Sequence, residues 1–257
     1  MKKTVYEINS SSFSKNICFA VVSDLHGRDP QKVIELLKEE SPDYILMPGD
    51  ILEKLDGENN KAFENGYKLL CEAAEIAPTF YSTGNHEDGA TRSWSPSWKK
   101  RIKQRVYDAE EVEKIKKSEA IMLDDEFVRY GEIAFGGLSS GLINEGGIPN
   151  TKWLDEFCSL DMPKVLLCHH PEYYETYLRE RNIDLIVSGH AHGGQWRFFG
   201  RGVFAPGQGV FPKYTYGVHD NRFVISTGLK TGKIPRFFNP PEVVFVKIKH
   251  KKTTPIG

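Results

Sequence analysis

Residues with metal-binding side chains fall in five short clusters of this 257-residue sequence. In chain order the clusters are Asp24-Leu25-His26, Gly49-Asp50, Gly84-Asn85-His86-Glu87, His169-His170-Pro171 and Gly189-His190-Ala191-His192. They supply carboxylate, amide oxygen and imidazole ligands. One metal ion needs three or four such groups. Seven are enough for two adjacent ions that share one carboxylate, so the sequence predicts a two-metal centre.

Taken alone, the clusters differ in how specifically they indicate a metal site. Gly49-Asp50 is an ordinary turn sequence, and an Asp such as Asp24 often caps a turn after a strand. Gly189 to Gly193 is more specific, because two imidazoles between glycines have little structural purpose. Six of the eight histidines lie in the clusters. All five clusters in this order favour a metal site over a purely structural interpretation.

The clusters follow segments that the pattern predicts to be buried strands. Residues 17–22, 44–47 and 79–82 are short apolar runs, typical of strands buried on both faces. Amphipathic helices are expected between them, over residues 30–40 and from about Phe63 to Ala74. This βαβαβ order predicts a largely parallel sheet. Ligands in such folds bind beyond the carboxyl ends of the strands, and that is where the clusters stand.

The second half predicts a further set of strands. Residues 165–168 and 185–188 are buried strands separated by a helical stretch, and 119–137 contains short strands with turns. Residues 214–226 indicate a hairpin about Asp220-Asn221, and 243–248 a last strand. Neither an internal repeat nor a linker divides the chain. We therefore expect one domain over residues 1–257, built from two packed sheets.

Composition limits the kinds of binding partner and the cellular location that we expect for this protein. A formal net charge of −1 gives no reason to expect a stable nucleic-acid partner. Four widely spaced cysteines are typical of free thiols in a reducing cytosol. The first apolar run has six residues, too few for a signal-peptide core or a membrane span. The sequence thus predicts a cytoplasmic protein without a membrane span, and makes no prediction of its oligomeric state.

The series Asp-x-His, Gly-Asp, Gly-Asn-His-Glu, His-x-Pro and Gly-His-x-His closely resembles the calcineurin-like metallophosphoesterases, from about residue 17 to 248. The stretches from Gly189 to Gln195 and from Phe238 to Glu242 resemble one bacterial branch. That branch includes membrane-anchored or exported phosphodiesterases and UDP-diacylglucosamine pyrophosphate hydrolases. We expect this protein to depart from the branch by lacking its N-terminal anchor. The resemblance implies an α/β (α+β) fold, a four-layer αββα sandwich of two mixed sheets flanked by helices.

The resemblance also gives each ligand a place. It assigns Asp24, His26 and His192 to the first metal, Asn85, His169 and His190 to the second, and Asp50 as the bridge. Two divalent ions about 3.5–4 Å apart share a hydroxide that attacks phosphorus in line. Imidazole and carboxylate ligands without cysteine argue against a structural zinc site. Manganese, iron and zinc all remain candidates for the two ions.

Two further histidines have open roles. His86 follows Asn85, and the resemblance assigns it no metal, so we expect it to be the catalytic acid that protonates the leaving oxygen. Its alternatives are a residue that orients others, or an extra ligand. His170 is expected to point away from the metals, because side chains alternate along a strand, and is a tentative substrate contact. Glu87 is expected to hydrogen-bond a neighbouring imidazole.

Residues 88–107 are a candidate flap over the site, because they begin directly after Glu87. Trp94 and Trp98 in this stretch would stack on a base or cover an apolar chain of the substrate. The basic run at residues 99–105 would attract a phosphorylated molecule. The alternative is an exposed helical excursion whose lysines are solvated and whose tryptophans pack on the domain.

The resemblance favours a phosphoesterase that hydrolyses a phosphodiester or pyrophosphate bond of a small phosphorylated substrate. One alternative is a phosphomonoesterase, including a protein phosphatase. Those enzymes clamp a dianionic phosphate with extra arginines, and here Arg28 and Arg92 are the only arginines close to a motif. A non-catalytic scaffold with the same fold is the other alternative. The complete ligand set argues against it, because a scaffold is expected to lose ligands.

Overall fold

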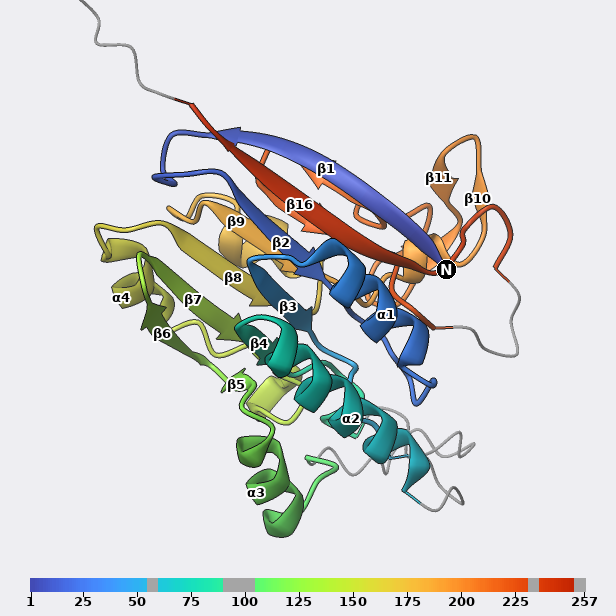
Figure 1. The fold of residues 1–257 in the computed structure, drawn as a ribbon. Helices are drawn as coiled ribbons and strands as arrows, with labels where there is room; N and C mark the ends of the chain where they lie inside the picture. The colour runs from blue at the N-terminus through green and yellow to red at the C-terminus, as the bar shows by residue number, and fades with distance from the viewer. Residues whose placement is uncertain (55–59, 90–104, 231–235, 252–257) are drawn as a thin grey trace, which may run out of the picture.

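The computed structural model describes residues 1–54, 60–89, 105–230 and 236–251. Two six-stranded sheets form its centre (Figure 1). The first contains, in spatial order, β1 (Lys2–Ser10), β16 (Glu242–His250), β2 (Ile17–Val21), β3 (Tyr44–Pro48), β4 (Thr79–Ser82) and β5 (Ile121–Leu123). The second contains β14 (Gly217–His219), β15 (Phe223–Ile225), β9 (Leu185–Ser188), β8 (Lys164–Cys168), β7 (Ile133–Leu138) and β6 (Glu126–Tyr130). Both sheets mix parallel and antiparallel pairs.

Three apolar clusters fill the spaces between four layers. The inner cluster joins the two sheets, and in it Phe80 of β4 stacks on Phe135 of β7 with ring centroids 3.8 Å apart. A second cluster packs α1 (Gln31–Glu40), α2 (Lys61–Ile76) and α3 (Ala109–Lys117) against the first sheet. A third lies between the second sheet and the turns α4 (Leu154–Ser159) and η3 (Tyr174–Leu178). The expected αββα sandwich is therefore confirmed.

The helices follow from their local sequence. Helix α1 buries Val33, Ile34 and Leu37, the apolar stripe that the sequence predicts, and each such side chain stabilises the fold by roughly 1.5–3 kcal/mol. Helix α3 begins at a capping box in which Asp108 accepts from two backbone N–H groups and Glu111 bonds back to Asp108. None of the helices in the described chain has the length and apolar character needed to cross a bilayer.

Some elements are absent from the sequence-based prediction. Strand β1 lies at the edge of the first sheet, parallel to β16, and buries Thr4 and Ile8 while Val5 faces solvent. The turn α4 was also not predicted. Two miniature hairpins are new as well, together with two single-turn helices. Their bounds are β10 (Arg197–Phe198), β11 (Arg201–Gly202), β12 (Phe204–Ala205), β13 (Gly209–Val210), η2 (Glu145–Gly147) and η4 (His192–Gly194).

Candidate metal centre

The seven predicted ligands come together where strands of both sheets end. Strands β2, β3 and β4 of the first sheet lead to Asp24 and His26, to Asp50 and to Asn85. Strands β8 and β9 of the second sheet lead to the remaining ligands, His169, His190 and His192. The sequence places all of these ends at one edge, and the structure divides them between two facing sheets. The centre therefore lies at the junction of the two halves of the sandwich.

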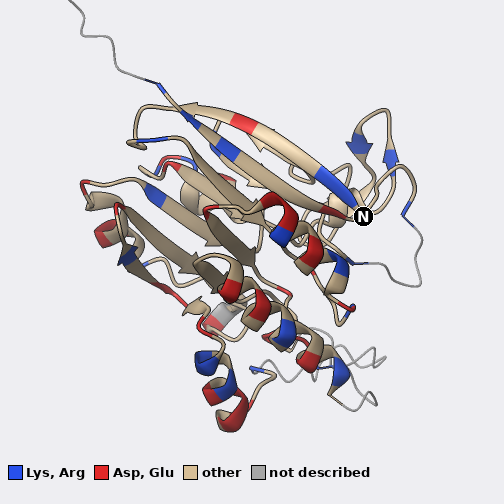
Figure 2. Cartoon of the chain, in the orientation of Figure 1, with Lys and Arg blue, Asp and Glu red and all other residues tan. Residues whose placement is uncertain are grey.

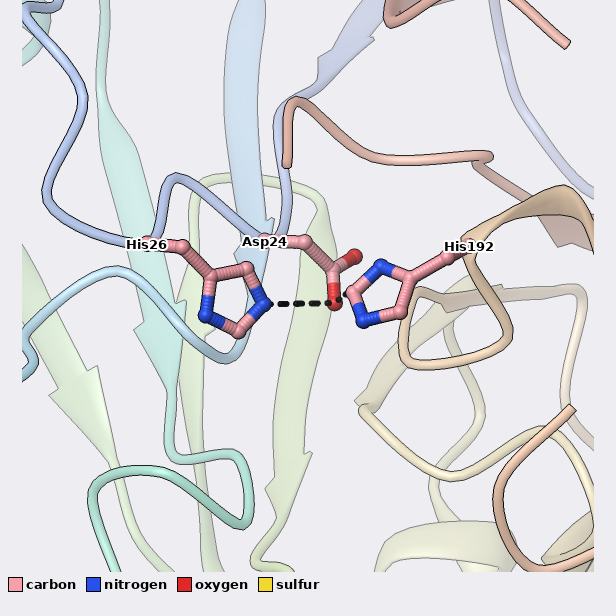
Figure 3. Close-up of side chains that lie close together, drawn as sticks. All are labelled: Asp24, His26 and His192. Carbon is pink, nitrogen blue, oxygen red and sulfur yellow. Dashed lines mark ion pairs between the residues drawn. The ribbon is translucent and has the colours of Figure 1, made fainter. Parts of the chain in front are cut away.

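Asp24, His26 and His192 form the first group (Figure 3). The Oδ1 atom of Asp24 is 3.8 Å from His26 Nε2 and 3.5 Å from His192 Nδ1. Both ring nitrogens are buried and have no hydrogen-bond partner. Buried polar atoms are almost always paired, and nitrogens facing a carboxylate at this spacing suit a cation between them. The residues present fit a metal ion.

His169, His190 and Asn85 form the second group. His169 Nε2 lies 3.0 Å from Asn85 Oδ1 and 3.2 Å from His190 Nδ1. The other ring nitrogen of His169, Nδ1, is 2.8 Å from the carbonyl oxygen of Pro48. A carbonyl only accepts, so Nδ1 carries the hydrogen and Nε2 is left with a lone pair facing the centre. The local structure thus prepares His169 as a ligand.

Asp50 stands between the two groups. Its Oδ2 atom is 3.5 Å from His26 Nε2 on one side and 3.3 Å from His169 Nε2 on the other. Its Oδ1 atom accepts the backbone N–H of His86 at 2.9 Å. One carboxylate oxygen therefore faces both groups while the other is held by the main chain.

The electrostatics of the centre favour the metal-binding protonation state for Asp50, His190 and His192. Burial opposes ionisation of Asp50, but the charges of His169 and His86 outweigh burial and hold the pKa of this carboxyl well below its ordinary value. Burial also lowers the pKa of His190 and His192 well below the ordinary value of an imidazole. Ionised carboxylates and neutral imidazoles are the forms that coordinate metal ions. For His26 and His169 burial alone would lower the pKa, but the neighbouring carboxylates raise it, to about 9 and about 10.

Five of the seven predicted ligands have a left-handed backbone, with φ between 47° and 65°. They are Asp24, His26, Asp50, His190 and His192. Non-glycine residues adopt this conformation infrequently, and it persists where the surrounding structure enforces it, often at functional sites. Here the enforcement is visible, because the Asp24 carboxylate accepts the backbone N–H of His190 at 3.1 and 3.2 Å.

Glycines precede two of the predicted ligands because a side chain at either position would overlap a carboxylate of the centre. A Cβ atom on Gly84 would lie 2.3 Å from Asp50 Oδ1, and one on Gly189 would lie 2.5 Å from Asp24 Oδ2. Both separations are far inside contact distance, so any side chain at these positions would displace a carboxylate. This close approach explains the glycine in Gly84-Asn85 and in Gly189-His190.

Glu87 has a different role from the one expected. Instead of an imidazole, its buried carboxylate binds four backbone N–H groups, at 2.8–3.0 Å, and the hydroxyl of Tyr81. The amide donors are Asp50, Ile51, Leu52 and Gly84. The expectation was wrong because Glu87 turns toward the loop after β3. It ties that loop to the end of β4, and so fixes Asp50 relative to Asn85.

Glu53 is a site residue that the sequence-based prediction missed. Its buried carboxylate is 3.0 Å from His26 Nδ1 and 2.5 Å from His86 Nδ1. Burial alone would raise the pKa of Glu53, yet the hydrogen bonds with His26 and His86 lower it to about 2. The one available signal was an acidic residue three positions after Asp50. With Nδ1 engaged, His86 has its Nε2 3.8 Å from Asp50 Oδ2.

The orientation expected for His170 was also wrong. Its ring lies against that of His190, with centroids 4.2 Å apart, and its Nδ1 is 3.0 Å from Glu172 Oε1. Strand β8 ends at Cys168, so side-chain alternation no longer applies two residues later, where the chain turns into Pro171. Trp94 and Trp98 lie outside the described residues.

Comparison with known proteins identifies the family. Residues 18–194, more than half of the chain, match the model of the calcineurin-like phosphoesterases. The chain therefore belongs to this family, whose general chemistry is metal-dependent hydrolysis of phosphoesters.

Several bacterial proteins are similar over most of the chain. "Uncharacterized protein YpbG" of Bacillus subtilis is 27% identical over 88% of this chain and 79% of its own length. "Uncharacterized metallophosphoesterase Cj0846" of Campylobacter jejuni is 25% identical over 96% and 63%, respectively. "Phosphodiesterase YaeI" of Escherichia coli is 26% identical over 72% and 58%. The chain thus spans less than two thirds of the length of the last two relatives.

Proposed function

We propose that this protein is a dinuclear metal-dependent phosphoesterase that hydrolyses a phosphodiester or pyrophosphate bond. The observation that carries the proposal is the position of Asp50, whose Oδ2 atom lies within 3.5 Å of ring nitrogens from both ligand groups. A site for one ion would need only one of these groups. A carboxylate oxygen that faces both is suited to two ions.

In this proposal each group holds one ion, and the ligands suit manganese, iron or zinc. The first ion would be held by Asp24, His26 and His192, the second by Asn85, His169 and His190, and both by Asp50. When bound, two such ions activate water at neutral pH and neutralise charge on the phosphoryl oxygens. The protein keeps the ligands in place through the hydrogen bonds that the Glu87 carboxylate and the Pro48 carbonyl accept, and through the strands that end at the ligands.

His86 is the proposed general acid. Its Nδ1 is held by Glu53, which leaves Nε2 directed at the centre, 3.8 Å from Asp50 Oδ2. From there it would protonate the leaving oxygen of the substrate. Glu53 would fix the ring of His86 and, through its other oxygen, the ring of the ligand His26.

A diester or pyrophosphate is favoured over a monoester by the arginines near the centre. Arg236 interacts electrostatically with Asp24. Both Nη atoms of Arg236, however, donate to backbone carbonyls, those of Gly228 and Thr227. Arg28 donates to the carbonyl of Leu229. Both guanidinium groups are thus engaged by backbone carbonyls, which supports a diester or pyrophosphate over a dianionic monoester. Arg92 lies outside the described residues. The name of the similar E. coli protein, a phosphodiesterase, points the same way.

Hydrolysis of bis-(p-nitrophenyl) phosphate and of p-nitrophenyl phosphate tests this proposal. The purified protein, freed of metal and reloaded with manganese, iron or zinc, is expected to give a higher kcat/KM on the diester. A higher value on the monoester would favour a phosphomonoesterase. No hydrolysis of either compound with any of the three metals would favour a non-catalytic scaffold. The single domain over 1–257, the flap at 88–107 and the cytoplasmic location stay predictions.

A further inference from the structure

Exposed phenylalanines gather on one part of the surface. Seven of the twelve exposed large apolar side chains of the described chain lie between residues 198 and 238. Six of them are phenylalanines, here called the aromatic rim: Phe198, Phe199, Phe204, Phe211, Phe237 and Phe238. They are carried by the hairpins β10–β11 and β12–β13 and by the chain before β16, and Figure 1 shows β10–β11 projecting from the body. Single exposed apolar residues are normal, but a cluster of this size marks an interaction surface.

The backbone of the rim holds its aromatic rings outward. Phe199, Phe211 and Phe238 have left-handed φ values of 49°, 52° and 53°, and they are 107%, 75% and 81% exposed. Bulky residues are genuine outliers in this conformation. Phe199 occupies a two-residue turn with positive φ at both central residues, where Asn-Gly is the usual sequence. These three phenylalanines are at least 75% exposed, so they contribute little to the packing of the domain.

The segment that carries the rim is basic in sequence, and the charged residues of the β10–β11 hairpin are the half-buried Arg197 and the exposed Arg201. The sequence from Gln195 to Phe238 contains seven lysines and arginines and one acidic residue, Asp220. Its net charge is therefore +6 in a chain whose total is −1, which leaves −7 for the rest. Figure 2 shows the basic positions on the β10–β11 hairpin with no acidic residue beside them. The β10–β11 hairpin of the rim thus combines exposed phenylalanines with two arginines.

The rim is attached directly to the metal centre. The side chain of Asn239, next to Phe238, donates to the carbonyl of the predicted ligand His192 at 2.6 Å. In the β12–β13 hairpin, Gly207 lies so close to Glu172 that a Cβ atom would be 2.0 Å from its Oε1. Glu172 in turn bonds His170 beside the second ligand group. The segments that carry the rim therefore contact the residues that surround the centre.

We propose that the aromatic rim docks the protein on the surface of an anionic lipid bilayer. Separate aromatic tips on narrow hairpins suit insertion between lipid headgroups, where aromatic rings are favoured, and the positive charge suits anionic lipids. A protein partner would instead be matched by a continuous, flatter face. The docking needs no phosphoesterase activity, so it stands or falls separately from the proposed function.

Cosedimentation with sucrose-loaded vesicles measures the docking. The wild-type chain is expected to bind vesicles of equal parts phosphatidylcholine and phosphatidylglycerol, and to bind pure phosphatidylcholine vesicles much more weakly. Raising the salt concentration should weaken binding to the anionic vesicles, because screening reduces the attraction of the basic residues. Arg201→Gln should weaken it about fivefold.

The decisive variant is Phe199→Asn combined with Phe211→Asn. Removing two inserting rings should lower the partition coefficient by about 100-fold. Asparagine tolerates left-handed backbone better than phenylalanine, so the double variant should fold at least as well as the wild type. The matched control is Val5→Asn with Ile148→Asn, which removes two exposed apolar residues elsewhere and should leave binding unchanged.

Three results would overturn the proposal. The first is a wild-type chain that binds neither kind of vesicle, and the second is a double variant that binds like the wild type with an unchanged melting temperature. The third is a dimer, seen by sedimentation equilibrium of the wild type without lipid, that the double variant converts to a monomer. In that case the rim binds a second copy of the chain and not a lipid bilayer.

Discussion

The metal centre and the aromatic rim are adjacent regions. Both contain residues with a left-handed backbone, but the side chains of these residues are buried in the centre and exposed in the rim. Five predicted ligand residues in the centre and three phenylalanines in the rim have left-handed φ values. Each such residue costs roughly 1–3 kcal/mol. In the centre this cost is offset by buried hydrogen bonds, such as those from backbone amides to Asp24 and Glu87. In the rim the aromatic side chains remain exposed, so any offset has to come from a partner.

The two regions also differ in what holds them. The centre sits on the ends of buried strands of four or five residues, whose positions are set by three apolar clusters. The rim sits on strands of two residues each. A site on buried strands keeps its geometry when a ligand leaves. Changes in the centre should therefore alter chemistry, whereas changes in the rim should alter attachment.

The largest effect is expected from Asp50→Ala. Removing the shared ligand should lower turnover of a phosphodiester by roughly 10³–10⁵-fold, because the charge stabilisation provided by two ions is worth several kcal/mol. Steady-state kinetics with bis-(p-nitrophenyl) phosphate measures this. Asp161→Ala, which removes an exposed carboxylate, is the control and should have normal turnover. A loss of less than tenfold in Asp50→Ala would contradict the shared-ligand role.

A smaller loss of roughly 10²–10³-fold in kcat is expected for His86→Ala, with metal content retained. The loss should be greater for substrates with poor leaving groups than for nitrophenyl esters, because only the former need a proton from His86. His219→Ala removes a histidine outside the clusters and serves as the control. If His86→Ala lost metal, the residue would be a ligand. Equal losses for all leaving groups would leave it an orienting or electrostatic role.

Glu53→Gln should reduce kcat by roughly 10–100-fold and leave KM nearly unchanged, because it loosens the rings of His26 and His86 without touching the substrate. Its leaving-group dependence should follow that of His86→Ala. The exposed residue Glu64 offers a matched control, Glu64→Gln. A rise in KM with unchanged kcat would mean that Glu53 acts on substrate binding instead.

The smallest expected effect is a change in stability, and its sign should differ between the aromatic rim and the metal centre. Phe199→Asn should raise the free energy of unfolding by roughly 0.5–1 kcal/mol, because it relieves left-handed strain at an exposed turn. Urea denaturation measures the change. The opposite sign is expected for His192→Phe, which buries a bulky side chain at a left-handed position. A destabilised Phe199→Asn variant would show that the ring packs on the domain after all.

The sequence predicted most of the sandwich and the ligand clusters because both depend on local patterns. Continuous apolar runs define the strands, and motifs directly after them define the clusters. Strand β1 was missed because it is an edge strand with a polar face and only two buried side chains, Thr4 and Ile8. Glu53 was missed because its partners, His26 and His86, come close only when the loops after β2, β3 and β4 fold together.

The rim was missed for a different physical reason. Its strands are too short to show a period, and its phenylalanines at residues 198–211 look like ordinary core residues in the sequence. Only their exposure in the folded chain reveals them. The turn of the chain after β8 likewise overrode the alternation that predicted the direction of His170.

Metal stoichiometry tests the central claim, a dinuclear centre bridged by Asp50, most directly. The metal-free protein is titrated with manganese, and bound metal per chain is measured together with activity. We expect two ions per chain at full activity in the wild type, and weakened binding at both positions in Asp50→Asn. Full activity with one ion per chain, or an Asp50→Asn variant that still binds two ions with wild-type affinity, would contradict the account.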